Sequence, residues 1–270
     1  MKHLTITIII LVIIIVSGCS KPKVVDIDKI TSLNGQSYYK HDMTLVTAVV
    51  KEWYKDGQLK AEENYKDGKK QGILKYWYKN GQLAQEYNCK DGKKQGTSKY
   101  WYENGQLMAE HNYKVDEKQG TSKYWHENGQ LKQEENYKDG KKQGILKSWY
   151  ENGQLKQEYN CKDDEIEGEV KMWYESGLPF GRMNFKAGMQ VDKAIMWWED
   201  GKLKYESNYK YGKKDGLTTI WNEDGELESE HIYKDGEIIG RTERDPIRKT
   251  EELLEYYKNQ RLEYYKNHKK

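Results

Sequence analysis

Apolar, aromatic and turn-forming positions recur every 24 residues between residues 50 and 240. A tryptophan occupies the same place in each of eight copies, namely Trp53, Trp77, Trp101, Trp125, Trp149, Trp173, Trp197 and Trp221. A glycine follows each tryptophan by four residues: Gly57, Gly81, Gly105, Gly129, Gly153, Gly177, Gly201 and Gly225. Eight copies in constant register identify a repeat array, in which each unit is stabilised mainly by its neighbours.

The copy from residue 67 to residue 91 predicts two strands joined by tight turns. Asn80-Gly81 favours a two-residue hairpin turn, because Asn and Gly readily adopt the positive φ that both central residues need. Asp67-Gly68 and Asp91-Gly92 carry the same signal. The stretches between the turns are rich in aromatic residues and lack proline, which is typical of antiparallel strands. We therefore predict an all-β protein, an elongated single-layer antiparallel meander that spans roughly 75 Å at about 4.8 Å per strand.

Strand alternation divides each repeat between two faces. A two-residue turn would place Trp77 opposite Ala84 and Lys75 opposite Glu86. The first face then collects Gly72, Leu74, Tyr76, Tyr78, Leu83, Gln85, Tyr87 and Cys89. The second collects Ile73, Lys75, Trp77, Ala84, Glu86 and Asn88. The Lys–Glu pair recurs as Lys51–Glu62, Lys99–Glu110, Lys123–Glu134 and Lys147–Glu158. Each pair contributes about 0.2–1 kcal/mol, which favours this register.

The sixth repeat departs from the pattern. Pro179 replaces the usual leucine, and Asp192 replaces the usual glycine. Lys171 faces Arg182 where other repeats have a glutamate. Proline cannot donate a ladder hydrogen bond, and like charges on facing strands repel each other. We expect a bend, a bulge or a specialised contact in this repeat.

The chain begins with features of a secreted bacterial protein. An apolar run from Leu4 to Val16 is too short to span a bilayer but suits the core of a signal peptide. The sequence Val16-Ser17-Gly18-Cys19 resembles the lipobox of bacterial lipoproteins. This resemblance implies removal of residues 1–18 and lipidation of Cys19, whose acyl chains would anchor the protein stably. Ser20 in place of Asp implies the outer membrane, if the cell has one. An uncleaved anchor or an ordinary signal peptide is the alternative.

Domain boundaries follow from these features. Residues 1–18 are the expected signal peptide, residues 19–42 a polar tether, and residues 43–240 the repeat array. Residues 241–270 form a charged tail, in which Thr250-Glu251-Glu252 is typical of a helix start. We expect either a helix that folds over the last strand or a solvated tail.

Composition limits the possible functions. The 46 basic and 44 acidic residues are interleaved and give a net charge of +2, so we expect no binding to nucleic acid. Cys89 and Cys161 stand three repeats apart, roughly 29 Å, which is too far for a disulfide. They occupy a place that is aromatic in the other repeats, so we interpret them as small apolar substitutes. No two histidines have metal-ligand spacing, and no nucleophile motif or phosphate-binding loop occurs. We expect no enzyme activity, no cofactor and no metal.

The repeat also resembles a known family. Trp-Tyr-x-Asn-Gly-Gln-Leu, followed by Asn-Tyr-Lys-Asp-Gly-Lys-Lys-x-Gly, resembles the MORN repeat variant and is similar to bacterial YwqK-type antitoxins of toxin–antitoxin systems. The resemblance covers residues 50–240. It implies a β-repeat fold and contact with protein or lipid, and it carries no catalytic residues.

Aromatic columns are the candidate binding surface. At two strands per repeat, Tyr76, Tyr78, Tyr100, Tyr102 and Tyr124 would line up about every 10 Å along one face. They either cover the single-layer sheet by packing or form a ladder for sugar rings or choline. Our first hypothesis is a membrane-anchored envelope lipoprotein that acts as a non-enzymatic scaffold for protein partners. The alternatives are a cell-surface carbohydrate- or choline-binding module and an antitoxin-like inhibitor.

Overall fold

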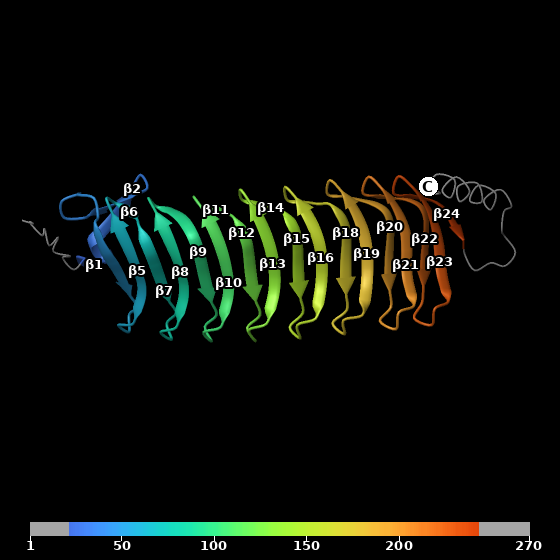
Figure 1. The fold of residues 1–270 in the computed structure, drawn as a ribbon, viewed down its shortest axis with the longest axis horizontal. Helices are drawn as coiled ribbons and strands as arrows, with labels where there is room; N and C mark the ends of the chain where they lie inside the picture. Colours follow the sequence, from blue (N-terminus) through green and yellow to red (C-terminus); the bar gives the residue numbers. More distant parts are fainter. Residues whose placement is uncertain (1–21, 243–270) are drawn as a thin grey trace, which may run out of the picture.

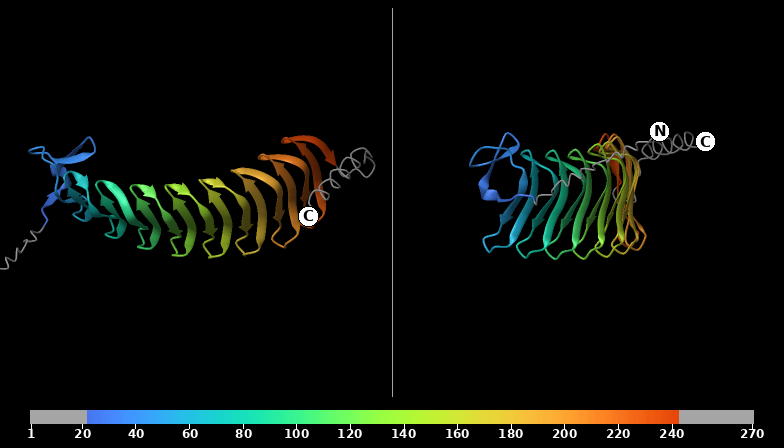
Figure 2. Two further views of the ribbon diagram at one scale, coloured as in Figure 1. Left: turned by 45° about the horizontal axis from the view of Figure 1, so that its top comes forward. Right: turned by 60° about the vertical axis from the view of Figure 1, so that its left-hand side comes forward.

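The repeat array is one long open sheet (Figure 1). The computed structural model describes residues 22–242, and 22 strands of this segment form a single sheet. From β4 (Ala48–Trp53) to β24 (Glu237–Thr242), each long strand pairs antiparallel with the next long strand of the chain. The sheet bends along its length, and within residues 22–242 only the small β2–β3 hairpin, at the N-terminal end, packs on it as a separate element (Figure 2). The predicted all-β meander is confirmed.

Each repeat contributes two main strands. The first ends at the repeat tryptophan: β4, β7 (Gly72–Trp77), β9 (Lys93–Trp101), β12 (Gly120–Trp125), β15 (Gly144–Trp149), β18 (Gly168–Trp173), β20 (Met189–Trp197) and β22 (Lys213–Trp221). The second ends at a lysine: β5 (Leu59–Lys66), β8 (Leu83–Lys90), β10 (Leu107–Lys114), β13 (Leu131–Lys138), β16 (Leu155–Lys162), β19 (Pro179–Lys186), β21 (Leu203–Lys210) and β23 (Leu227–Lys234). Four first strands are preceded by a two-residue strand: β6 (Lys69–Lys70), β11 (Glu117–Lys118), β14 (Lys141–Lys142) and β17 (Glu165–Ile166).

The two ends of each hairpin use different turns. Asp67 and Gly68 have φ values of 50° and 75°, which is the two-residue turn that the sequence predicts. At the other end Gly81 has a φ of 84°, but Asn80 keeps a negative φ. The amide of Gly81 donates to the carbonyl of Tyr78 (3.0 Å), and the amide of Tyr78 donates to the carbonyl of Gln82 (2.8 Å). This is a longer turn closed by a glycine bulge, so the predicted two-residue turn at Asn80-Gly81 is wrong.

The longer loop shifts the register only beside itself. Pairing of β7 with β8 follows the prediction as far as Tyr76, but Trp77 then lies opposite Leu83 rather than Ala84. A bulge absorbs the extra loop residue, and the same shift occurs beside every repeat tryptophan. Beyond it the predicted faces hold. All five Lys–Glu pairs form, with N–O distances between 2.8 and 3.5 Å.

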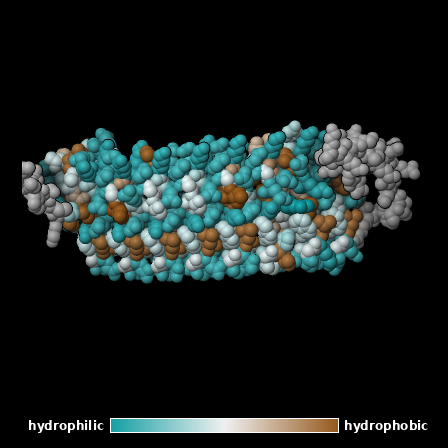
Figure 3. Space-filling model, viewed as in Figure 1, coloured by the Kyte–Doolittle hydropathy of each residue, from teal (hydrophilic) through white to brown (hydrophobic). Residues whose placement is uncertain are grey.

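One face of the sheet holds most of the buried side chains. We call it the inner face; it carries Leu74, Tyr76, Gln85, Tyr87 and Cys89 and the equivalent positions of the other repeats. Its most deeply buried column is Val50, Leu74, Ser98, Ser122, Leu146, Val170, Ala194 and Thr218, each at most 1% exposed. The outer face carries the Lys–Glu pairs. From the side shown in Figure 1 the surface is largely hydrophilic, with one more hydrophobic row along the lower hairpin ends (Figure 3).

Neighbouring columns of the inner face compensate each other in volume. Leu74 packs with the small Cys89, whereas two repeats later the same two columns hold the small Ser122 and the large Tyr137. Interiors keep a near-constant packing density, so volume removed from one column returns in the next. Cys89 and Cys161 are both buried and free, and burial raises the pKa of each thiol.

Residues 22–42 are folded, which corrects the expectation of a polar tether. They form β1 (Val24–Asp26), a 3-10 turn at Ile27–Lys29, β2 (Ile30–Leu33) and β3 (Gln36–Tyr39). β1 pairs in parallel with β4, at the edge of the first repeat. Their apolar side chains build one cluster with the first repeat: Val25, Ile30, Tyr39, Val46, Ala48, Val50 and Tyr65. The segment therefore caps the array, and it lacks the repeat period because these contacts are made across the chain.

The sixth repeat keeps the common register. Pro179 lies opposite Trp173, as leucine does elsewhere, at the first residue of β19, where a missing amide costs least. Lys171 and Arg182 do face each other, but each has another partner. Lys171 pairs with Glu169 (3.5 Å), and the Arg182 guanidinium lies 5.7 Å from the centre of the Trp197 ring. The irregular sequence thus changes the side-chain contacts of this repeat, while the register between β18 and β19 stays the same as in the other hairpins.

Several expectations concern residues outside 22–242. They are the signal peptide, lipidation of Cys19, and the charged tail apart from its first two residues. In the described segment, no helix has the length and apolar character needed to cross a membrane.

Candidate binding face

The structure separates the predicted tyrosines into two groups. Tyr76, Tyr100 and Tyr124 lie half-buried in one column of the inner face. Tyr78 and Tyr102 lie in the hairpin loops instead, where their hydroxyls donate to the backbone carbonyls of Trp101 (2.7 Å) and Trp125 (2.8 Å). Only the first group belongs to a continuous face; the second group connects successive repeats.

This connection between loops recurs in every neighbouring pair of repeats. The residue after each tryptophan donates to the carbonyl of the next repeat tryptophan, at 2.7–3.1 Å: Tyr54, Tyr78, Tyr102, His126, Tyr150, Tyr174 and Trp198. The side-chain amide of Asn80 adds a bond to the carbonyl of Glu103 (2.8 Å), and Asn104, Asn128 and Asn152 do the same. We call this row the loop ladder. The repeat-defining tryptophans take part through their backbone carbonyls.

The repeat-defining glycines share a backbone reason to be glycine. All eight have φ between 84° and 87°, a region that side chains rarely adopt. At Gly105 a Cβ would also meet the end of the Gln82 side chain from the preceding repeat, whereas nothing lies within 4 Å of such a Cβ at Gly57 or Gly201. The loop ladder therefore depends on backbone conformation in every repeat.

The inner face contains two buried acidic clusters that the sequence analysis missed. Glu63 is 7% exposed and accepts hydrogen bonds from Lys70 (2.7 Å), Tyr65 (2.7 Å) and Tyr76. Burial raises the pKa of this carboxyl, but the hydrogen bonds from Lys70, Tyr76 and Tyr65 outweigh it and lower the pKa overall. Burial and the same carboxylate raise the pKa of Tyr76.

The second cluster repeats the first three repeats later. Glu135 is 3% exposed and accepts hydrogen bonds from Lys142 (2.6 Å), Tyr137 (2.6 Å) and Tyr124 (3.3 Å). Burial raises its pKa, and the bonds from Lys142 and Tyr137 more than reverse this, so the carboxyl stays ionised at neutral pH. Burial and Glu135 together raise the pKa of Tyr124 to about 12.

Between these two acidic clusters the same column holds a histidine, His111, in place of a glutamate. This imidazole is 7% exposed, and its ring lies 5.0 Å from that of Tyr124 and 5.5 Å from that of Tyr100. Burial, together with the nearby charge of Lys118, lowers the pKa of His111 to about 4. The ring is therefore neutral at physiological pH and packs as an aromatic group.

Lysines lie over the tyrosine rings along the same face. The ammonium group of Lys94 lies 4.8 Å from the ring centre of Tyr87 and 5.1 Å from that of Tyr113. Lys118 lies 4.7 Å from the ring centre of Tyr137, and Lys214 repeats the arrangement further along. The aromatic cages that could hold a cationic ligand thus already contain lysine.

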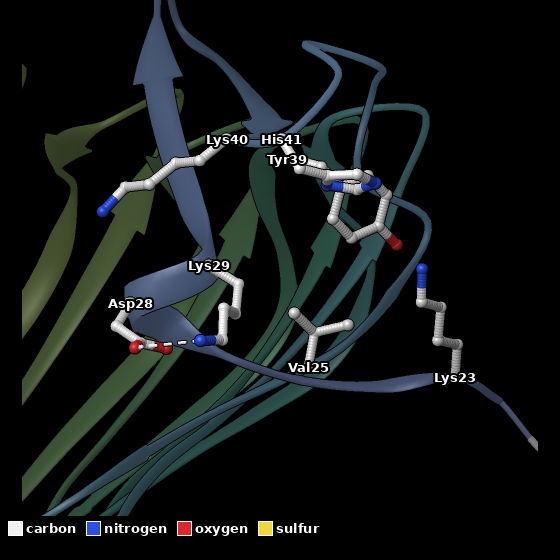
Figure 4. A pocket seen from close by; sticks show the side chains of 7 residues that line it. All are labelled: Lys23, Val25, Asp28, Lys29, Tyr39, Lys40 and His41. Atoms are coloured by element: carbon white, nitrogen blue, oxygen red, sulfur yellow. Dashed lines mark ion pairs between the residues drawn. The ribbon is translucent and has the colours of Figure 1, made fainter.

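A small pocket lies in the N-terminal cap, away from the repeats (Figure 4). It has a volume of about 300 Å³ and is lined by Lys23, Val25, Asp28, Lys29, Tyr39, Lys40 and His41. Lys23 lies 4.3 Å from the centre of the Tyr39 ring, and Lys29 pairs with Asp28 at 3.6 Å. The pocket is open and holds four basic side chains, Lys23, Lys29, Lys40 and His41, beside Val25 and the ring of Tyr39.

A periodic signal for the inner-face clusters was present in the sequence. Lysine recurs at Lys70, Lys94, Lys118 and Lys142, and strand alternation places these residues on the face of Tyr76. Their partners come from separate strands, so no short motif contains them. Among the described residues, no group of three metal-ligating side chains gathers.

The comparison with protein families gives a consistent result. The MORN repeat variant matches residues 47–67, 70–91, 94–114, 118–139, 142–163, 193–211 and 214–235. The matches leave out residues 164–192, the irregular sixth repeat, although that repeat folds in the common register. A comparison with curated proteins gave no match. The matched repeats cover more than half of the chain, so the chain belongs to the MORN repeat variant family.

Proposed function

We propose that this chain is a non-enzymatic repeat scaffold that binds protein partners and is anchored in the cell envelope by lipid on Cys19. The observation that carries the scaffold function is the single-layer sheet with charged and aromatic groups along an inner face that, within the described residues, is covered only at the first repeat by the N-terminal cap. A surface repeated every 24 residues offers many equivalent contacts, and such contacts increase affinity when they act together.

The anchor is supported by the sequence Val16-Ser17-Gly18-Cys19. The first strand begins at Val24, five residues after Cys19. Five residues span at most about 18 Å, so the cap and the first repeat would lie close to the membrane surface. The proposed location is the outer membrane, if the cell has one.

The absence of enzyme activity is part of the proposal. The two buried carboxylates of the inner face are already engaged: Glu63 and Glu135 accept hydrogen bonds from lysine and tyrosine. Their pKa values are lowered, which disfavours a role as general acid. We also propose no nucleic-acid partner, because acidic and basic residues alternate along the array.

Two other functions have weaker support. A choline-binding module needs free aromatic cages, whereas Lys94 and Lys118 already lie over these tyrosines. A carbohydrate-binding module needs free aromatic faces, and Tyr76, Tyr100 and Tyr124 are only half-exposed. The similarity to antitoxins suggests an inhibitor, but an envelope lipoprotein would not meet a toxin in the cytosol.

The test of the scaffold is capture of a partner from envelope extract by the full chain, followed by binding of the purified partner. We expect one protein to bind saturably and with salt dependence. Retention on choline or glycan resin without a protein partner would overturn the scaffold in favour of the carbohydrate- or choline-binding alternative. The anchor is tested separately with an alkyne fatty acid, which should label the wild type and not Cys19→Ala; equal labelling would contradict it.

A further inference from the structure

Two lysines in the middle of the inner face carry charge that no acidic side chain of the described segment neutralises. Lys94 and Lys118 form no ion pair within residues 22–242, and their ammonium groups donate only to tyrosine hydroxyls, at 3.1 and 3.0 Å. The equivalent residues on either side, Lys70 and Lys142, differ because each pairs with a buried glutamate. The middle of the face is therefore positive, and its two flanks are neutral.

These two ammonium groups are held in place before any partner arrives. Lys94 lies over the rings of Tyr87 and Tyr113, and Lys118 lies over that of Tyr137. Ammonium groups already held by aromatic rings and tyrosine hydroxyls lose little further freedom when they bind, which favours recognition of an anion.

The side chains beneath the same lysines are the least satisfied of the described segment. Three buried polar atoms lack a hydrogen-bond partner there: Ser98 Oγ, His111 Nδ1 and Ser122 Oγ. Ser98 lies directly opposite His111, and Ser122 follows in the next hairpin. All three fall in the repeats that contain Lys94 and Lys118. This part of the face therefore has polar groups whose hydrogen bonds are not all made within the described segment.

The spacing of the lysines limits the shape of the ligand. Lys94 and Lys118 are two strands apart, which is about 9.6 Å. A polyproline II segment advances about 3.1 Å per residue with three residues per turn, so the same side of the segment returns every ~9.3 Å. A β-strand returns every two residues, about 6.6 Å, and falls out of step with the repeats. Aromatic faces are also the surfaces that bind polyproline II segments in other proteins.

Building on the proposed scaffold function, we propose that the inner face from β8 to β13 binds an acidic, proline-rich segment of a partner protein in the polyproline II conformation. The segment runs along the array, across the strands. Acidic side chains three residues apart meet Lys94 and Lys118, and a neutral side chain meets the repeat of Glu135.

The test uses the full chain and three synthetic peptides. The first consists of Pro-Pro-Glu triplets, the second of Pro-Pro-Gln triplets, and the third has the composition of the first with its glutamates in adjacent pairs. We expect the first peptide to bind about tenfold more tightly than the second, within the range that two exposed ion pairs give, and more tightly than the third, whose glutamates meet only one of the two lysines at a time. Equal binding of the first and second peptides would overturn the charge contacts, and equal binding of the first and third would overturn the three-residue period.

A pair of double variants locates the contact. Lys94→Met with Lys118→Met keeps the apolar stems on the tyrosine rings and removes both charges, so binding of the first peptide should fall about tenfold. Lys69→Met with Lys93→Met is the matched control, because these exposed lysines are also 24 residues apart and should leave binding unchanged. Unchanged binding after the first double substitution would overturn the proposal. If the captured partner still binds that variant, the scaffold function stands and only this inference fails. If the wild type captures no partner but binds the first peptide, the peptide contact stands and the proposed scaffold function fails.

Discussion

The loop ladder and the inner face use the same 24-residue repeat in opposite ways. In the loop ladder one hydrogen bond recurs between seven successive pairs of repeats, although its donor is a tyrosine five times, a histidine once and a tryptophan once. On the inner face, the column of Tyr87 changes in nearly every repeat: Glu63, Tyr87, His111, Glu135, Tyr159, Met183, Ser207 and His231. In the ladder the acceptor is the same backbone carbonyl in every repeat. On the inner face only the location in the repeat recurs, and the side chain there changes.

The difference teaches how a linear array combines regular structure with varied chemistry. The ladder bonds backbone carbonyls, which are the same in every repeat, so any donor of suitable length serves. Inner-face side chains meet mainly those of adjacent strands, so one substitution needs only a local match, as Leu74 with Cys89 illustrates. Stability therefore resides at the loop edge and in the packing of each repeat, and specificity is free to reside in a few repeats of the inner face.

The largest effect should come from breaking the register that both regions share. Deleting residues 103–126 removes one whole repeat and brings Tyr102 to the place of His126, where its hydroxyl reaches the carbonyl of Trp149. This variant should fold with an unchanged strand spectrum in circular dichroism. Deleting residues 110–132 instead removes 23 residues at a junction inside a strand and joins Ala109 to Gln133, so it reverses the faces of the residues that follow in that strand and should melt early or aggregate. Similar melting of the two deletions would refute the register.

The buried acidic cluster should account for the next largest effect. Glu135→Ala leaves Lys142, Tyr137 and Tyr124 without their common acceptor, and we expect a loss of about 2–3 kcal/mol in the free energy of unfolding. The loss stays below that of a fully enclosed pair because water reaches Lys142. Glu134→Ala is the control. Glu134 is the neighbour of Glu135 in sequence but faces outward and pairs with Lys123, so this variant should lose less than about 1 kcal/mol in the free energy of unfolding. Urea unfolding at neutral pH compares the two, and equal losses would contradict the buried role.

His111 should make stability depend on pH. Its folded pKa of about 4 lies below the unfolded value of about 6.5, so the unfolded chain takes up the proton first as the pH falls. The free energy of unfolding is therefore highest above pH 6.5 and decreases by about 2 kcal/mol between pH 6.5 and pH 5, before glutamates titrate.

Urea unfolding at several pH values checks this dependence. His111→Gln should remove this slope, whereas His231→Gln, at the equivalent position of the last repeat, should keep it. A slope that survives in His111→Gln would show that another group is responsible.

A single bond of the loop ladder should have the smallest effect. Tyr102→Phe removes the donor to the carbonyl of Trp125 and keeps the ring, so the free energy of unfolding should fall by about 1 kcal/mol. Tyr211→Phe is the control, because that side chain is 71% exposed and should change stability very little. Thermal melting of both variants tests this prediction. Equal melting temperatures would show that the hydrogen bond of the loop ladder does not contribute to stability.

Much of the array could be predicted from local patterns. The tryptophan period, the turn at Asp67-Gly68 and the pairing of Lys75 with Glu86 were all visible, because each depends on residues close in sequence. The turn at Asn80-Gly81 was not, since Asn80 Oδ1 accepts the amide of Gln82 (3.0 Å) and a longer loop satisfies the same residues. The cluster around Glu135 was also missed, because its donors come from three different strands.

The sequence by itself determined the period, the all-β architecture and the face of the strand residues beyond the bulge at each tryptophan, because turn chemistry and strand alternation act over a few residues. The tertiary structure decided what required neighbours. Residues 22–42 became a cap because Val25 and Ile30 found Val46 and Val50 across the chain. Glu63 and Glu135 became buried ion pairs, while Lys94 and Lys118 stayed without acidic partners, because the side chain on the adjacent strand differs from repeat to repeat.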